Sequence, residues 1–248
     1  MKPIALITGA TSGIGEATAR ILAKKYRLII TGRRAERLDQ LESELKTEVQ
    51  KLVFDVRDRE AVNNSIEGLP SDWKAIDVLI NNAGNAHGLA PIQEGNVDDW
   101  DAMIDINIKG LLYVSKAIIP GMVDRQKGHI INIGSVAGIE AYPNGNVYNA
   151  SKYGVNGLTQ GMRMDLISHN IKVSEIKPGL VQTEFSEVRF KGDQEKAEKV
   201  YQGYDPLQAQ DIAETIEFIL SRPAHVNIAD MLVLAGSQAS ATMVNKKS

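Results

Sequence analysis

The chain has 248 residues, of which 43% are hydrophobic and 24% are charged, an ordinary composition for a globular protein. Its 28 Lys and Arg residues against 31 Asp and Glu residues give a net charge of −3, which leaves no basic excess for binding nucleic acid or an anionic membrane. The lack of cysteine excludes a disulfide framework, a thiolate nucleophile, Cys-ligated zinc and an iron–sulfur cluster. Apolar runs such as Ile4–Ile7 are too short for a membrane span or a signal-peptide core, so we expect a cytoplasmic protein.

Short apolar runs rich in β-branched residues alternate with stretches of helical periodicity. The runs predict strands at Ile4–Thr8, Leu28–Thr31, Val49–Phe54, Ile76–Ile80, His129–Ile133, Lys172–Ile176 and Met231–Leu234. Helices are predicted at Ile14–Lys25, Arg34–Leu45, Val97–Val123, Val147–His169 and Gln208–Leu220. This alternation is typical of βαβ units with right-handed crossovers, and nearly continuous apolar strands indicate helices on both faces of the sheet. We predict one α/β domain over residues 1–248, a doubly wound Rossmann fold with a mostly parallel seven-stranded sheet.

One segment interrupts the alternation. Residues 182–205 are mostly polar and charged, and they lie between the sixth predicted strand and the helix Gln208–Leu220. A long segment at the carboxyl end of a strand more often covers a binding site than serves as a plain connection. We therefore predict a substrate-covering loop there.

A glycine-rich turn follows the first predicted strand. Residues Thr8–Gly15 read Thr-Gly-Ala-Thr-Ser-Gly-Ile-Gly and lead into a predicted helix, whose N-terminus can hold a pyrophosphate. The spacing differs from the G-x-G-x-x-G dinucleotide fingerprint, and no Gly-Lys-Ser/Thr follows as in a P-loop. For the turn alone, a glycine-rich connection that binds nothing is the alternative.

The end of the second predicted strand indicates which dinucleotide is bound. A site selective for NAD usually has an acidic side chain there for the ribose 2′-hydroxyl, whereas this chain has Arg33 and Arg34. Two guanidinium groups suit a 2′-phosphate. The alternative, a solvated basic helix start, places positive charge unfavourably at a helix N-terminus. We therefore favour NADP as the cofactor.

Tyr148 and Lys152 stand four residues apart, on one face of a predicted helix. Ser135 and Asn82–Gly84 follow strands whose ends should meet at the ligand crevice of a doubly wound sheet. Tyrosine, with a pKa of about 10, is a poor base near neutral pH, but a neighbouring ammonium and a positive nicotinamide lower that pKa. We predict that Tyr148 moves the proton of a substrate hydroxyl during hydride transfer, while Ser135 binds the substrate oxygen.

Together these residues, in this order and at these spacings, resemble the classical short-chain dehydrogenases/reductases over essentially the whole chain. The resemblance implies a catalytic set of Asn107, Ser135, Tyr148 and Lys152, in which Asn107 joins through a water-mediated proton relay and Lys152 also binds the nicotinamide ribose. It implies that Asp55 and Val56 contact the adenine. The whole NADP site that we predict consists of Gly9, Thr11, Ser12, Gly13, Ile14, Gly15, Arg33, Arg34, Asp55, Val56, Asn82, Ala83, Gly84, Tyr148, Lys152, Pro178, Gly179, Val181 and Thr183.

A narrower resemblance, to NADP-dependent 3-hydroxy acid dehydrogenases, lies in Gly128–Ser135, Glu184–Asp193 and Pro223–Ile228. Those enzymes act on serine, L-allo-threonine and related acids, so the resemblance implies oxidation at C3 and a homotetramer. Besides Ser135 and Tyr148, we predict substrate contacts from Arg189 and Lys191, because a carboxylate substrate needs a cationic partner. For either residue, a charged side chain in a solvated loop is the alternative.

Other functions are less well supported by the sequence. His87, His129, His169 and His225 have no metal-ligand spacing, so we expect no metal site. Two alternatives to a 3-hydroxy acid dehydrogenase remain: a reductase of 3-oxoacyl thioesters or simple ketones, and a non-catalytic regulator that senses NADP. The Tyr148–Lys152 pair disfavours the regulator, which has no need of it.

Overall fold

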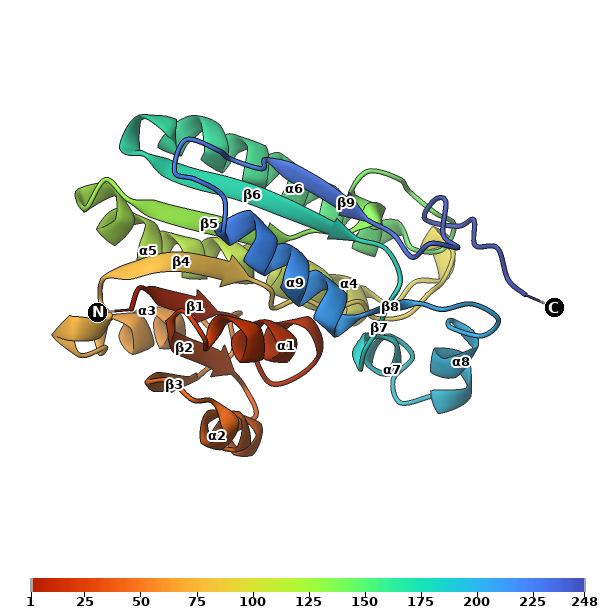
Figure 1. Ribbon diagram of the computed structural model, residues 1–248. Helices are drawn as coiled ribbons and strands as arrows, with labels where there is room; N and C mark the ends of the chain where they lie inside the picture. The colour runs from red at the N-terminus through yellow and green to blue at the C-terminus, as the bar shows by residue number, and fades with distance from the viewer. Residues whose placement is uncertain (1, 248) are drawn as a thin grey trace.

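A seven-stranded parallel sheet forms the centre of the computed structural model, which describes residues 2–247 (Figure 1). The strands lie in the order β3-β2-β1-β4-β5-β6-β9, and each pairs in parallel with its neighbours. Their bounds are β1 (Ile4–Ile7), β2 (Arg27–Gly32), β3 (Val49–Val53), β4 (Ile76–Asn81), β5 (Gly128–Ile133), β6 (Ile171–Pro178) and β9 (Asp230–Val233). The predicted fold class is confirmed. The chain changes direction between β1 and β4, which opens a ligand crevice at the carboxyl ends of these strands.

Helices cover both faces of the sheet (Figure 1). One apolar core lies beneath α1 (Gly13–Leu22), α2 (Ala35–Glu44) and α9 (Ala209–Leu220). The other lies beneath α3 (Arg59–Glu67), α5 (Leu111–Asp124) and α6 (Asn146–Leu166). The helix α3 is absent from the sequence-based prediction. It begins at Asp58, whose side chain accepts hydrogen bonds from the backbone of Glu60 and Ala61, the arrangement expected of an N-cap.

The predicted helix Val97–Val123 is a composite element. It consists of α4 (Val97–Ile104), a π-helical turn over Asp105–Gly110, and α5. π-Helical turns inside helices frequently occur at functional sites. Here the wider turn contains Asn107, which is buried.

The polar segment 182–205 contains two short helices, α7 (Phe185–Arg189) and α8 (Gln194–Lys199). A two-stranded parallel sheet of β7 (Val181–Gln182) and β8 (Leu207–Gln208) joins the two ends of the segment. In Figure 1 the helices lie beyond the carboxyl edge of the main sheet. Within residues 2–247, no helix is both long enough and apolar enough to cross a membrane.

Candidate active site

The glycine-rich turn forms an open cradle at the start of α1. Gly9 and Gly13 have φ angles of +67° and +54°, which glycine adopts without strain. A Cβ atom on Gly15 would lie 2.3 Å from the Gly9 carbonyl oxygen, so this glycine permits close packing of the turn on the helix. Within the described residues, Ser12 at the N-cap makes no side-chain capping hydrogen bond. The N-terminus of α1 therefore remains open to an anionic group.

Arginine side chains gather where β2 meets α2. Arg34 donates hydrogen bonds to Thr11 Oγ1 at 3.0 Å and to Ser12 Oγ at 2.9 Å, which ties it to the glycine-rich turn. Arg34 and Arg37 both form ion pairs with Glu184, which directly precedes α7. Arg33 is exposed to solvent. Sequence reasoning missed Arg37, because only the fold brings it to the segment that contains Glu184.

The predicted reacting groups come together at the other end of the crevice. Tyr148 and Lys152 project from α6, and the Lys152 ammonium donates a 2.9 Å hydrogen bond to the carbonyl of Ile133. Its nitrogen lies 5.9 Å from the centre of the Tyr148 ring. Ser135 lies two residues after the end of β5 in extended backbone, and its hydroxyl accepts a hydrogen bond from the Ala137 amide at 3.1 Å.

Asn107 lies behind this group. Its side-chain amide donates to the Asn85 carbonyl and to Ser151 Oγ, both at 2.9 Å, and its oxygen accepts from the Asn85 amide. A Cβ atom on Gly84 would lie 3.0 Å from Asn107 Oδ1 and 3.6 Å from Lys152 Nζ. Asn107 therefore fixes the strand-end segment that lies next to Lys152.

Burial shifts the pKa values of both central groups. Burial raises the pKa of Tyr148 well above its usual value; Tyr142 adds to the rise, and Ser135 and Arg189 oppose it. Burial lowers the pKa of Lys152 to about 8, against the opposing charge of Glu175. Lys152 is thus mainly cationic at neutral pH, while Tyr148 needs further positive charge beside it to ionise.

The two predicted substrate cations lie in different places. The guanidinium carbon of Arg189 lies 5.6 Å from the centre of the Tyr148 ring, and Arg189 donates a 2.9 Å hydrogen bond to the Tyr142 hydroxyl. Lys191 forms a 3.0 Å ion pair with Asp99 and is 58% exposed. The structure therefore brings Arg189 to the reacting end and places Lys191 outside it.

A cleft of ≈ 310 Å³ connects the phosphate cradle with the reacting groups. Ser135 and every residue of the predicted NADP site line it, except Gly15, which packs behind the turn. Lining side chains that sequence reasoning missed include Phe54, Ile106 and Val188. No motif marks these apolar residues, because their place in the site depends on tertiary packing. Within residues 2–247, no three His, Asp or Glu side chains are grouped as a metal site requires.

Comparison with known proteins settles the family, because residues 3–194 match the short chain dehydrogenase family. The chain belongs to the short-chain dehydrogenases. It is 48% identical over 240 residues to the NADP-dependent 3-hydroxy acid dehydrogenase YdfG of Salmonella typhi, covering 96% of this chain and 97% of that protein. It is 42% identical over 242 residues to the serine 3-dehydrogenase of Rhizobium radiobacter, covering 97% of each.

The solved structures agree with this assignment. The closed form of serine dehydrogenase complexed with NADP⁺ matches this short-chain dehydrogenase with a TM-score of 0.94 and 44% identity, over 99% of this chain and 100% of that one. The serine dehydrogenase of Escherichia coli matches with a TM-score of 0.84 and 40% identity, over 95% and 99%. The resemblance noted from the motifs is confirmed.

Proposed function

We propose that this short-chain dehydrogenase transfers hydride between NADP and C3 of a small 3-hydroxy acid, such as serine or L-allo-threonine. One observation carries the choice of substrate: the Arg189 guanidinium lies over the ring of Tyr148. A carboxylate paired with Arg189 would hold C3, the hydroxyl-bearing carbon two bonds from the carboxylate carbon, close to the phenol. The names of the relatives, 3-hydroxy acid dehydrogenase and serine dehydrogenase, support the same substrate class.

The cleft fits a phosphorylated dinucleotide. The open N-terminus of α1 would hold the pyrophosphate, and Arg33 and Arg34 would hold the 2′-phosphate. Val56 would lie along the adenine, and Pro178 and Val181 would lie along the nicotinamide, as we expect from the family. When bound, the cofactor accepts or donates the hydride and, in its oxidised form, adds positive charge near Tyr148.

The chain's own groups would move the proton. In the oxidation direction Tyr148 Oη removes the proton from the substrate hydroxyl, and in reduction it returns that proton. Lys152 stabilises the phenolate, which offsets the effect of burial on the pKa of Tyr148. Ser135 donates a hydrogen bond to the substrate oxygen, and we assign the proton relay behind Lys152 to the turn that contains Asn107.

The proposal extends to assembly and location. We expect a cytoplasmic homotetramer, as the family resemblance implies, and α6 offers a surface for contact between subunits. Gly157 and Gly161 lie on this helix, and among the described residues nothing lies within 4 Å of a Cβ atom added to either. Small residues of this kind permit a second helix to approach closely.

The first test is the reduction of NADP and, separately, of NAD by the purified protein. The substrates are both enantiomers of serine, L-allo-threonine, 3-hydroxybutyrate, 3-hydroxyisobutyrate and a neutral secondary alcohol. We expect turnover of the hydroxy acids with NADP. If instead NADPH reduces only ketones or 3-oxoacyl thioesters, the substrate assignment is wrong. Binding of NADP without turnover of any substrate would favour the alternative of a non-catalytic regulator that senses NADP.

Arg189→Met tests the carboxylate contact. We expect KM for a 3-hydroxy acid to rise at least about tenfold, because the charge-assisted pair is lost. Turnover of the neutral alcohol should fall by less, because it loses only the effect of Arg189 on the pKa of Tyr148. Lys191→Met is the matched control: it removes a cation two residues away that pairs with Asp99, so KM should stay within about twofold. Equal effects of Arg189→Met on the acid and the alcohol would contradict the assigned role.

A further inference from the structure

A buried carboxylate lies behind the catalytic lysine, outside the mechanism described above. Glu175 on β6 is 0% exposed. Within residues 2–247, its oxygen Oε1 accepts no hydrogen bond. Lys177, two residues along the strand, forms an ion pair with Glu175 Oε2 at 3.1 Å. A charged group in the interior is costly unless nearby groups compensate it, so the Glu175 carboxylate requires positive charge close by.

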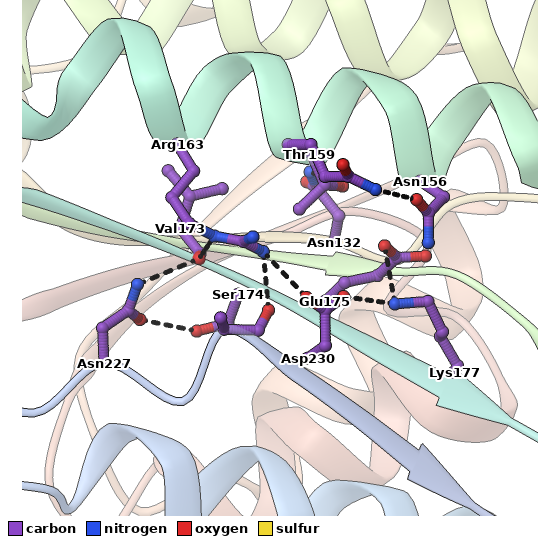
Figure 2. A network of polar contacts seen from close by, with 12 residues as sticks. Asn132, Asn156, Thr159, Arg163, Val173, Ser174, Glu175, Lys177, Asn227 and Asp230 are labelled. Carbon is purple, nitrogen blue, oxygen red and sulfur yellow. Dashed lines mark hydrogen bonds and ion pairs between the residues drawn. The ribbon is translucent and has the colours of Figure 1, made fainter.

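The sheet register directs Glu175 toward α6, the helix that bears Tyr148 and Lys152. Glu175 pairs in register with Asn132 on β5, so the two side chains lie on the same face of the sheet. Asn132 donates a 2.9 Å hydrogen bond to Thr159 of α6, which identifies that face. In Figure 2 the Glu175 carboxylate projects from β6 toward α6, on the side of Asn156, which lies one turn beyond Lys152.

The carboxylate also packs against the segment that holds the reacting groups. A Cβ atom on Gly134 would lie 2.1 Å from Glu175 Oε1, so only glycine leaves room for the carboxylate there. Gly134 lies between Ile133, whose carbonyl accepts the hydrogen bond from Lys152, and the catalytic Ser135. Glu175 therefore lies directly beneath the end of β5, where the Lys152 ammonium is held.

We propose that Glu175 is a positioning residue for Lys152. The buried carboxylate of Glu175 acts as the counter-charge that keeps the Lys152 ammonium protonated and in place. The inference rests on the proposed role of Lys152 in stabilising the Tyr148 phenolate. The charge of Glu175 opposes the effect of burial on the pKa of Lys152.

Other charged groups also face Glu175. Lys177 lies on the same strand and is shared between Glu175 and Asp230 of β9, and Arg163 of α6 approaches Asp230 (Figure 2). Burial raises the pKa of Glu175 and Asp230 adds to the rise, while Lys177 and, to a smaller extent, Lys152 oppose it. The carboxylate and the Lys152 ammonium therefore each favour the charged form of the other.

A thermodynamic cycle measures this effect without any turnover. The free energy of unfolding of the wild type minus that of Lys152→Met changes with pH mainly where Lys152 titrates in the folded or the unfolded state. The lower edge of that pH window reports the folded-state pKa. The same measurement is then made with Glu175→Gln present in both proteins, the one with Lys152 and the one with Lys152→Met. We expect the lower edge of the pH window to move down by at least about half a pH unit.

Three variants serve as controls. Glu175→Asp keeps the charge and should restore the wild-type edge. Asp230→Asn removes the other carboxylate around Lys177 but leaves Glu175 in place, so it should move the edge by less than Glu175→Gln does. If Glu175→Gln alone does not fold, Glu175→Gln combined with Lys177→Met removes both members of the buried ion pair, a change that proteins often tolerate.

Kinetics give a second readout. In Glu175→Gln above pH 8, kcat for a 3-hydroxy acid should fall at least about threefold, because a pKa of Lys152 lower by about half a unit leaves about one third as much of the cation. KM for NADP should stay within about twofold, because Glu175 lies outside the cleft lining. If Glu175→Gln leaves the lower edge of the pH window in the thermodynamic cycle unchanged, the inference is wrong. If the wild type oxidises no 3-hydroxy acid, the proposed function fails, yet the cycle still decides the role of Glu175.

Discussion

At the residue scale, the buried Lys152 ammonium makes stability depend on pH. Its folded pKa of about 8 lies below the 10.5 of the free side chain. Below pH 8 both states carry the proton, and the folded protein bears the full cost of the buried charge. Between pH 8 and 10.5 the unfolded state binds more protons, so the contribution of Lys152 to the free energy of unfolding rises with pH.

Lys152→Met tests this dependence. The free energy of unfolding of the wild type should rise relative to that of Lys152→Met by about 3 kcal/mol between pH 8 and 10.5. Denaturant unfolding of both proteins across this range measures the difference, and groups common to the two proteins cancel. A difference that is constant with pH would contradict the assigned burial of the ammonium.

At the element scale, the polar segment 182–205 is attached to the cofactor end of the cleft. Glu184, which directly precedes α7, pairs with Arg34 and Arg37 near the start of α2. A 2′-phosphate held by the same guanidinium groups would compete with this carboxylate. The position of α7 and the occupancy of the phosphate site therefore depend on each other.

Glu184→Gln should tighten the binding of NADPH about two- to five-fold, the size expected for removing a half-exposed competing charge. The binding of NADH should change by less, since it lacks the 2′-phosphate. Fluorescence titration of both cofactors measures this. Glu187→Gln, an exposed carboxylate on α7, is the control and should leave both affinities as in the wild type. Equal tightening of both cofactors would show that Glu184 acts in another way.

At the scale of the whole molecule, one face of α6 has the features of a contact between subunits. Tyr153, Gly157, Gly161 and Met164 recur at helical spacing, and the side chains of Tyr153 and Met164 are 47% and 71% exposed. We expect Gly161→Arg to reduce the mass measured by light scattering, because a long charged side chain would block a close helix contact. Gln40→Arg on α2 is the control. A tetramer that persists in Gly161→Arg would exclude this face as the interface.

The central architecture was predictable because the strands are short, apolar and separated by regular helical periodicity. The helix α3 was missed because its sequence is mostly polar and Val62 alone among its residues is fully buried. The helices α7 and α8 escaped prediction for a related reason: they are too short for a periodic pattern to show.

The residues of the candidate site also differ in whether a local sequence pattern marks them. Ser135, Tyr148 and Lys152 were identifiable because their chemistry requires particular residue types at particular spacings. Glu175 and Arg37 act through partners distant in sequence, so no local pattern marks them. Arg189 and Lys191 are both cationic and lie two residues apart, so the sequence does not distinguish them. In the structure the backbone turns at Lys191, where φ is +53°, and Arg189 contacts Tyr142 while Lys191 contacts Asp99.

The small sheet of β7 and β8 has a consequence for proteolysis. Its ladder pairs Val181 with Leu207 and Gln182 with Gln208, so residues 183–206 form a closed loop whose base is held in the fold. Such a loop can open locally while the main sheet stays intact. A protease that cuts between α7 and α8 should therefore leave two fragments that remain associated, because α9 and β9 on the far side of the cut belong to the core. Gel filtration of the nicked protein should show a single species, and separation of the fragments would mean that the loop is integral to the fold.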